Sequence, residues 1–282
     1  MQSLHGKIAL VTGATKQIGR GVAIGLAEAG AKVYVTGRYI SKRRYGKRNP
    51  WGTLNQTIKE IEEVGGIGVA VKCDHQKDNE TRAVFDKIEQ DEGRLDILVN
   101  GVWQGYDKMR ADKAYPWEAN FWKQPPELWD DMFMGVRASY IANSMAPPLM
   151  IKQKRGLIVN ITWFAGRAYM ENVAYGVAHA ALDRMAADMA VDLRPHNIAA
   201  ISLCPMGAVE DTQWNVKNAE SGRFIGRVVN GLYNDKELLS KSGGIFGTRL
   251  LAKSYGITDD NGQLPQITPF AERKLKYYPE WE

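Results

Sequence analysis

A glycine-containing turn between residues 11 and 21 has the residue types and spacing that hold a phosphate group. It follows an apolar run at 7–12 and precedes a stretch with the apolar periodicity of a helix. Glycines let the backbone approach a pyrophosphate, and the start of the helix offers unpaired N–H groups and a partial positive charge. A purely structural turn is the alternative, but the strand before it and the helix after it favour a dinucleotide site. The cofactor contacts expected from this loop are Gly13, Thr15, Lys16, Gln17, Ile18 and Gly19.

The residues that follow the second predicted strand indicate which dinucleotide the loop holds. A carboxylate at this point accepts the ribose hydroxyls of NAD, whereas a basic residue accommodates the 2′-phosphate of NADP. Here the strand leads through Thr36 and Gly37 to Arg38, and Lys16 in the glycine loop can approach the same phosphate. The sequence therefore predicts NADP(H) as the cofactor.

The positive charge of the chain is concentrated just beyond this strand. The formal net charge is +5, from 37 basic and 32 acidic residues. Residues 38–49 contain no acidic side chain and six basic ones, which are Arg38, Lys42, Arg43, Arg44, Lys47 and Arg48. Outside this run the two signs balance, so we expect attraction of an anionic ligand here and no nucleic-acid partner. A solvated loop is the alternative for this run.

Short apolar runs rich in β-branched residues alternate with helix-period segments along most of the chain. The predicted strands occupy 7–12, 32–36, 67–72, 95–100, 157–162 and 198–203, and the predicted helices occupy 19–30, 54–64, 78–92, 126–151 and 174–194. This alternation implies parallel strands joined by right-handed crossovers. We predict an α/β fold, a single Rossmann-type domain over 1–282 with a doubly wound parallel sheet and helices on both faces. Its cofactor half covers about 1–155.

Two longer segments, at about 101–129 and 205–240, interrupt the alternation and are expected to form the substrate side. The first is rich in tryptophan, tyrosine and phenylalanine. Long excursions at the ligand side of a sheet commonly form binding walls, although aromatic rings that pack the excursion onto its own body explain the composition equally well. The candidate substrate contacts are Trp103, Trp163, Phe164 and Tyr169. They predict a bulky hydrophobic or aromatic substrate.

The remaining composition is that of a soluble protein. No apolar run approaches the roughly 20 residues that cross a bilayer, and the first residues do not resemble a signal peptide. Cys73 and Cys204 give neither a disulfide framework nor a metal-ligand spacing, and each adjoins an apolar run. We expect a cytoplasmic protein with two buried thiols, no membrane association and no metal.

These residues together resemble the short-chain dehydrogenase/reductase family over most of the chain. The family pattern T-G-x-x-x-G-x-G matches Thr12 to Gly19, with Gln17 in place of the middle glycine. A branch typified by dehydrogenase/reductase member one also shares Gly37-Arg38 and the run Tyr175-Gly176-Val177. The resemblance implies further cofactor contacts at Asp74, His75, Asn100, Gly101, Pro205 and Gly207.

The same resemblance implies the catalytic residues. Tyr175 stands at the tyrosine of the family motif Y-x-x-x-K and is the expected proton donor or acceptor. Thr162 stands where the family spacing places a serine whose hydroxyl positions the carbonyl group. His179 replaces the lysine, and an imidazole with an ordinary pKa of about 6.5 is mostly neutral at pH 7. Tyr175 and His179 are also expected to contact the cofactor. Met134 occupies the stretch where some members have an asparagine, so the water relay of those members is not expected.

Three functions are compatible with these residues. The first is an NADP(H)-dependent carbonyl reductase or alcohol dehydrogenase, with Tyr175 as acid, Thr162 as carbonyl donor and His179 as ribose ligand or proton shuttle. The second is an enzyme of this fold adapted to lyase, isomerase or cyclase chemistry, and the third is a non-catalytic NADP(H)-binding protein. The survival of Tyr175 and of a hydroxyl at position 162 favours the first. Proteins of the family usually pair through two long helices, so we expect a homodimer or homotetramer.

Overall fold

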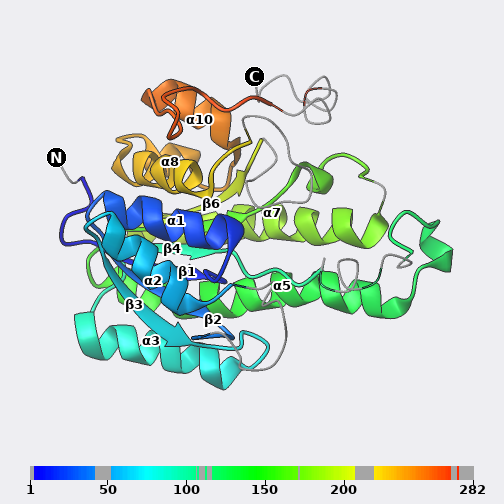
Figure 1. The fold of residues 1–282 in the computed structure, drawn as a ribbon, viewed down its shortest axis with the longest axis horizontal. Helices are drawn as coiled ribbons and strands as arrows, with labels where there is room; N and C mark the ends of the chain where they lie inside the picture. Colours follow the sequence, from blue (N-terminus) through cyan, green and yellow to red (C-terminus); the bar gives the residue numbers. More distant parts are fainter. Residues whose placement is uncertain are drawn as a thin grey trace.

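One parallel sheet organises the structure, a computed structural model that describes residues 3–41, 52–105, 107, 112, 116–170, 172–206, 219–267 and 272. Within these residues seven strands lie in the order β3-β2-β1-β4-β5-β6-β7 (Figure 1). They are β1 (Ile8–Thr12), β2 (Lys32–Gly37), β3 (Ile67–Lys72), β4 (Ile97–Asn100), β5 (Gly156–Ile161), β6 (Ile198–Cys204) and β7 (Ile245–Gly247). All six strand pairs are parallel, which confirms the predicted doubly wound sheet. The strand order reverses between β1 and β4, where such sheets bind their ligands.

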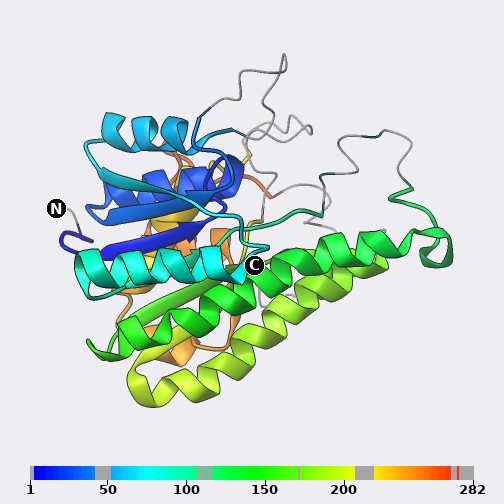
Figure 2. The same cartoon turned by 90° about the horizontal axis from the view of Figure 1, so that it is seen from below.

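Helices cover both faces of the sheet, as Figure 2 shows. Side chains alternate along each strand, so Ala9 and Val11 of β1 face one layer and Ile8 and Leu10 face the other. The first layer contains α1 (Gln17–Glu28), α2 (Leu54–Glu63) and α8 (Gly222–Asn234), and the second contains α3 (Asp78–Glu92), α5 (Pro126–Met145) and α7 (Val173–Leu193). Shorter helices are α6 (Pro147–Ile151), α9 (Leu238–Lys241), α10 (Thr248–Tyr255) and the 3-10 turns Phe121–Lys123, Phe164–Gly166 and Arg194–His196.

The predicted elements agree with the observed ones, except that one predicted helix is divided and that α8, α9, β7 and α10 were not among the predictions. The predicted helix over 126–151 is divided, because α5 ends at Met145 and α6 begins at Pro147, a residue without an N–H group to continue the helix. The segment 205–240, expected on the substrate side, contains α8 in its later part. This helix belongs to the core: Phe224, Ile225 and Val228 are fully buried in the same cluster as β1.

Glycines allow α1 and α8 to approach each other closely. A Cβ atom at Gly21 would overlap the backbone of Gly222, and one at Gly25 would lie 2.6 Å from the carbonyl oxygen of Arg223. At the same contact Arg223 forms a two-point ion pair with Glu28 of α1, with its Nη2 2.7 Å from Oε1. The last third of the chain therefore supports the helix that follows the glycine loop.

Three bulk expectations can be compared with the described residues. None of their helices is long and apolar enough to cross a membrane. They contain no group of three or more histidine, cysteine or acidic residues arranged to hold a metal ion. Cys73 and Cys204 are free and buried, as predicted.

Candidate active site

The glycine loop and the end of β4 form a tightly packed backbone cradle. Gly13 has a φ of +70°, and a Cβ atom there would lie 2.8 Å from the carbonyl oxygen of Gly101. A Cβ atom at Gly19 would lie 2.5 Å from the carbonyl oxygen of Gly13. The first turn of α1 carries no acidic residue, so nothing there opposes an anion at the positive end of the helix. Small residues thus hold β1, β4 and α1 together at the point where a pyrophosphate is expected.

Gln17 makes this loop unusual, because it has a left-handed conformation without being glycine. Its φ is +47°, a region that costs an ordinary residue about 1–2 kcal/mol. The carbonyl oxygen of Gln17 lies against the first residue of α8, where a Cβ atom at Gly222 would meet it at 2.9 Å. The start of α8 therefore packs directly against the strained turn at Gln17.

Arg38 lies directly after β2 with an exposed side chain, as expected of a residue that meets a phosphate. Its Nη2 lies 3.5 Å from Oδ2 of Asp107, which comes from the segment after β4. Lys16 is the N-cap residue of α1. The two basic side chains thus follow β2 and β1, neighbouring strands of the sheet. The basic run at 42–48 lies outside the described residues.

The residues after β3 form an internal network. The imidazole of His75 is buried between two hydroxyls, with Nε2 2.7 Å from Thr36 Oγ1 and Nδ1 3.1 Å from Thr81 Oγ1. Burial lowers the pKa of His75 to about 4, so the ring is neutral near pH 7. Asp74, half-buried, accepts a hydrogen bond from the backbone N–H of Gln76. The His75 side chain therefore ties β3 to β2 and α3, while Asp74 remains the candidate for a cofactor contact.

Asn100, at the end of β4, belongs to a buried group of three asparagines. Its Nδ2 donates to Oδ1 of Asn143 on α5 at 2.7 Å and to Oδ1 of Asn160 on β5 at 3.1 Å. Its Oδ1 accepts a longer hydrogen bond from Thr12 on β1, at 3.4 Å. The side chain of Asn100 therefore joins the central strands, and Asn143 was missed by sequence reasoning because an isolated asparagine in a helix gives no signal.

Tyr175 lies in the first turn of α7, enclosed by aromatic rings. The Asn172 side chain caps the helix by accepting from the Tyr175 N–H at 2.9 Å, and its Nδ2 donates to the carbonyl oxygen of Trp117. The Tyr175 ring is 4% exposed, with edge contacts to Trp117 at a centroid distance of 5.4 Å and to Trp103 at 5.9 Å. The capping residue thus also fixes the aromatic segment against the tyrosine.

His179 is one helical turn further along and is buried. Its ring stacks on Trp103 with centroids 4.7 Å apart and meets the edge of Tyr175 at 4.5 Å. Gly135 on α5 makes room for this arrangement, because a Cβ atom there would lie 2.8 Å from the Trp103 ring. Burial lowers the pKa of His179 to about 3, and neither ring nitrogen has a hydrogen-bond partner among the described residues. The imidazole at the lysine position is therefore uncharged.

Thr162 and Asp183 are two further buried polar residues, and neither Thr162 Oγ1 nor Asp183 Oδ1 has a hydrogen-bond partner among the described residues. Thr162, directly after β5, is 2% exposed, and Asp183, one turn beyond His179 on α7, is 7% exposed. Gly166 leaves space for the carboxylate, since a Cβ atom there would lie 2.6 Å from Asp183 Oδ2. Burial raises the pKa of Asp183 to about 6, while the hydroxyls of Thr162 and Ser202 act in the opposite direction. Sequence reasoning missed Asp183.

The other predicted contacts divide between core and surface. Phe164 is fully buried with Cys204 and Met206, so its ring packs the core, and its contact with a substrate stays a prediction. Trp163 is half-buried beside it, whereas Tyr169 is 68% exposed. Pro205 follows β6 and is buried, and Gly207 lies outside the described residues.

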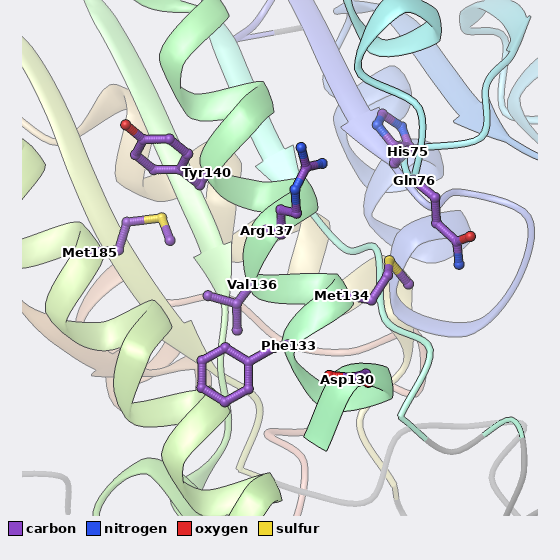
Figure 3. Close-up of a pocket in the computed structure, with 9 residues that line it drawn as sticks. All are labelled: His75, Gln76, Asp130, Phe133, Met134, Val136, Arg137, Tyr140 and Met185. Atoms are coloured by element: carbon purple, nitrogen blue, oxygen red, sulfur yellow. The ribbon is translucent and has the colours of Figure 1, made fainter. Parts of the chain in front are cut away.

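An open groove of about 650 Å³ lies along α5 (Figure 3). It is lined by His75, Gln76, Asp130, Phe133, Met134, Val136, Arg137, Tyr140 and Met185. Tyr175, Thr162 and His179 do not line it, so this groove is separate from the candidate catalytic residues.

Comparisons with known proteins agree with the predicted fold and family. Residues 7–221 match the family model for short chain dehydrogenases. The chain is 34% identical to dehydrogenase/reductase SDR family member 1 of Mus musculus over 281 residues. The alignment covers 92% of this chain and 85% of that protein. It is 28% identical over 222 residues to 7α-hydroxysteroid dehydrogenase of Escherichia coli (strain K12), and the alignment covers 77% of each chain. A metagenomic short-chain oxidoreductase in complex with NADP superposes with a TM-score of 0.67 at 26% identity, over 86% of this chain and 96% of that one.

The chain therefore belongs to the short-chain dehydrogenase/reductase family. The resemblance predicted from its motifs, including the branch of member one, is confirmed, and with it the class of oxidoreductases.

Proposed function

We propose that the protein is an NADP(H)-dependent carbonyl reductase or alcohol dehydrogenase for a bulky hydrophobic or aromatic ketone and its alcohol. The observation that carries this proposal is Tyr175, held by a helix cap at the start of α7 and surrounded by Trp103 and Trp117. An aromatic enclosure favours an apolar substrate, because such a substrate loses little hydration on entry. Relatives named 7α-hydroxysteroid dehydrogenases are consistent with an alcohol on a large apolar skeleton.

The cradle residues are compatible with a dinucleotide cofactor at the carboxyl ends of β1, β2 and β4. Gly13, Gly19 and Gly101 leave no room for side chains where the backbone must approach a pyrophosphate. Arg38 already pairs with an anionic group, Asp107, and a 2′-phosphate is the anion that we assign to Arg38 and Lys16. When bound, NADP(H) supplies or accepts the hydride.

The chain itself handles the proton. Tyr175 donates a proton to the carbonyl oxygen in reduction and receives it back in oxidation. Thr162 donates a hydrogen bond to the same oxygen, in the role that the family gives to serine. His179 is uncharged, so its ring nitrogens offer a hydrogen bond to a ribose hydroxyl but no positive charge for a tyrosinate.

The proposal is tested by following the loss of reduced nicotinamide absorbance with NADPH and a panel of ketones, from steroid-like and aromatic compounds to short aliphatic ones. We expect turnover with the bulky ketones, and NADPH to be preferred over NADH. Tyr175→Phe should lose at least a hundredfold in kcat, whereas Tyr140→Phe, a matched change at an exposed position on α5, should keep full activity. NADPH binding without turnover on any ketone would reject the reductase and leave the enzyme of lyase, isomerase or cyclase type and the non-catalytic binding protein.

The remaining expectations extend this proposal. A cytoplasmic protein that forms a homodimer or homotetramer is consistent with the family and with the long helices α5 and α7. The assembly is measured by light scattering.

A further inference from the structure

Arg38 and Asp107 form an ion pair between two segments that lie far apart in the sequence. Nη2 of Arg38 is 3.5 Å from Oδ2 of Asp107, and the two side chains are 41% and 24% exposed. Arg38 directly follows β2, Asp107 belongs to the segment after β4, and β1 lies between these two strands in the sheet. The carboxyl ends of parallel strands meet at one edge of a sheet, where the ligand binds. The ion pair therefore joins the two sides of the glycine loop, which follows β1.

The turn that carries Asp107 is tied to two other parts of the fold. The Asp107 N–H donates to the carbonyl oxygen of Gln104 at 2.8 Å. The side-chain oxygen of Gln104 accepts a hydrogen bond from Nε2 of Gln76, which follows β3. Nε2 of Gln104 lies 3.4 Å from Oδ1 of Asp131 on α5. These contacts place the Asp107 carboxylate at the edge of the sheet where a dinucleotide is expected.

Arg38 has a second contact, which does not involve Asp107. Its guanidinium carbon lies 5.9 Å from the centroid of the Tyr39 ring, a distance typical of a cation–π interaction. The planar guanidinium group fits a phosphate or a carboxylate at two points, with nitrogen–oxygen distances below 3 Å. The 3.5 Å contact with Asp107 is longer than that. A phosphate, with nearly two negative charges and three oxygen acceptors, is therefore a stronger partner for Arg38 than this carboxylate.

We propose that Asp107 is a specificity-determining residue for the cofactor, because its carboxylate competes with the 2′-phosphate of NADP(H) for Arg38. The phosphate either displaces the carboxylate or binds beside it against like-charge repulsion, and both weaken the binding of NADP(H). NAD(H) has a neutral hydroxyl at this position and does not meet this competition. Asp107 therefore reduces the preference for NADP(H) that Arg38 and Lys16 create. This inference rests on the proposed assignment of NADP(H) as the cofactor.

The dissociation constants of NADPH and NADH, measured by tryptophan quenching without a substrate, test the proposal. An exposed ion pair changes an equilibrium constant by up to about fivefold. We therefore expect Asp107→Asn to lower the dissociation constant of NADPH about threefold to fivefold and that of NADH by less than about twofold. Asp130→Asn removes the same charge at an exposed position on α5 and should leave both constants unchanged. If Asp107 only stabilises the fold, Asp107→Asn will bind NADPH equally well or more weakly, and that result would overturn the proposal.

The same titrations in an Arg38→Gln background test whether Asp107 acts through Arg38. Arg38→Gln alone should raise the dissociation constant of NADPH about tenfold or more, and the addition of Asp107→Asn should then change it by less than about twofold. An equal gain in affinity without Arg38 would mean that Asp107 repels anions in general, and it would overturn the competition. If Arg38→Gln leaves NADPH binding unchanged, the NADP(H) assignment and this inference both fail. If Arg38→Gln weakens NADPH binding and Asp107→Asn has no effect, this inference fails and the NADP(H) assignment stands.

Discussion

The buried imidazole of His179 should make the protein lose stability as the pH falls. Its pKa is about 3 in the folded protein and about 6.5 in the unfolded chain. Between these values the unfolded chain binds the proton and the folded protein does not, so the free energy of unfolding decreases as the pH is lowered through this window. The difference of about 3.5 between the two pKa values lowers the free energy of unfolding by about 5 kcal/mol in total once the pH is below 3. About 2 kcal/mol of this loss occurs between pH 7 and pH 5.

The measurement is urea unfolding at pH 5, 6 and 7 for the wild type and His179→Gln. Asp183, whose pKa is raised to about 6, acts in the opposite direction, because protonation of its buried carboxyl favours the folded state. The readout is therefore the difference in pH dependence between the two proteins, and not the stability of either one. We expect the variant to lose about 2 kcal/mol less than the wild type between pH 7 and pH 5.

A matched control is His196→Gln, because His196 is exposed in the 3-10 turn after α7. It should keep the wild-type dependence. If His179→Gln and the wild type lose stability in parallel, then His179 becomes protonated in the folded protein. This result would reject the uncharged state of His179 on which the proposed mechanism depends.

Three further changes give distinct outcomes. Because His179 supplies no charge, the rate of alcohol oxidation should keep rising into alkaline pH, and His179→Lys should move this rise to lower pH. An unchanged pH profile in this variant would show that position 179 does not have the role of the family lysine. Arg38→Glu should raise the NADPH dissociation constant at least tenfold and affect NADH little, as measured by tryptophan quenching; equal affinities would reject the 2′-phosphate assignment. Gly222→Val places a side chain where α1 and α8 touch and should cost about 1–3 kcal/mol or more in urea unfolding, and a variant as stable as the wild type would contradict the close contact.

The sheet could be predicted because its signals are local. Each strand through β6 is a short apolar run, and the glycine loop is recognised from fewer than a dozen consecutive residues. The apolar spacing of Phe224, Val228 and Leu232 was also a local helix signal, and it was obscured by the polar and glycine residues around it. β7, with three residues, is too short to be recognised from sequence.

The environment of the candidate site could not be predicted, because it depends on contacts between distant segments. The neutral state of His179 results from its burial, and the Trp103 ring that stacks on it comes from the segment after β4. The raised pKa of Asp183 results from burial, which only the folded chain provides. The resemblance to the family predicted Tyr175 and Thr162 as catalytic residues, but the protonation states of their neighbours depend on the folded molecule.

The contact between α1 and α8 also bears on the order of events during synthesis. Gly21 and Gly25 leave the ribosome early, whereas Gly222, which covers them, is made about two hundred residues later. A nascent chain that stops short of α8 leaves the glycine face of α1 open to water and the Gln17 turn without its neighbour. Such long-range contacts form late. Capture of the nucleotide should accordingly be one of the last steps of folding, and ribosome-bound chains that end before α8 should fail to retain it.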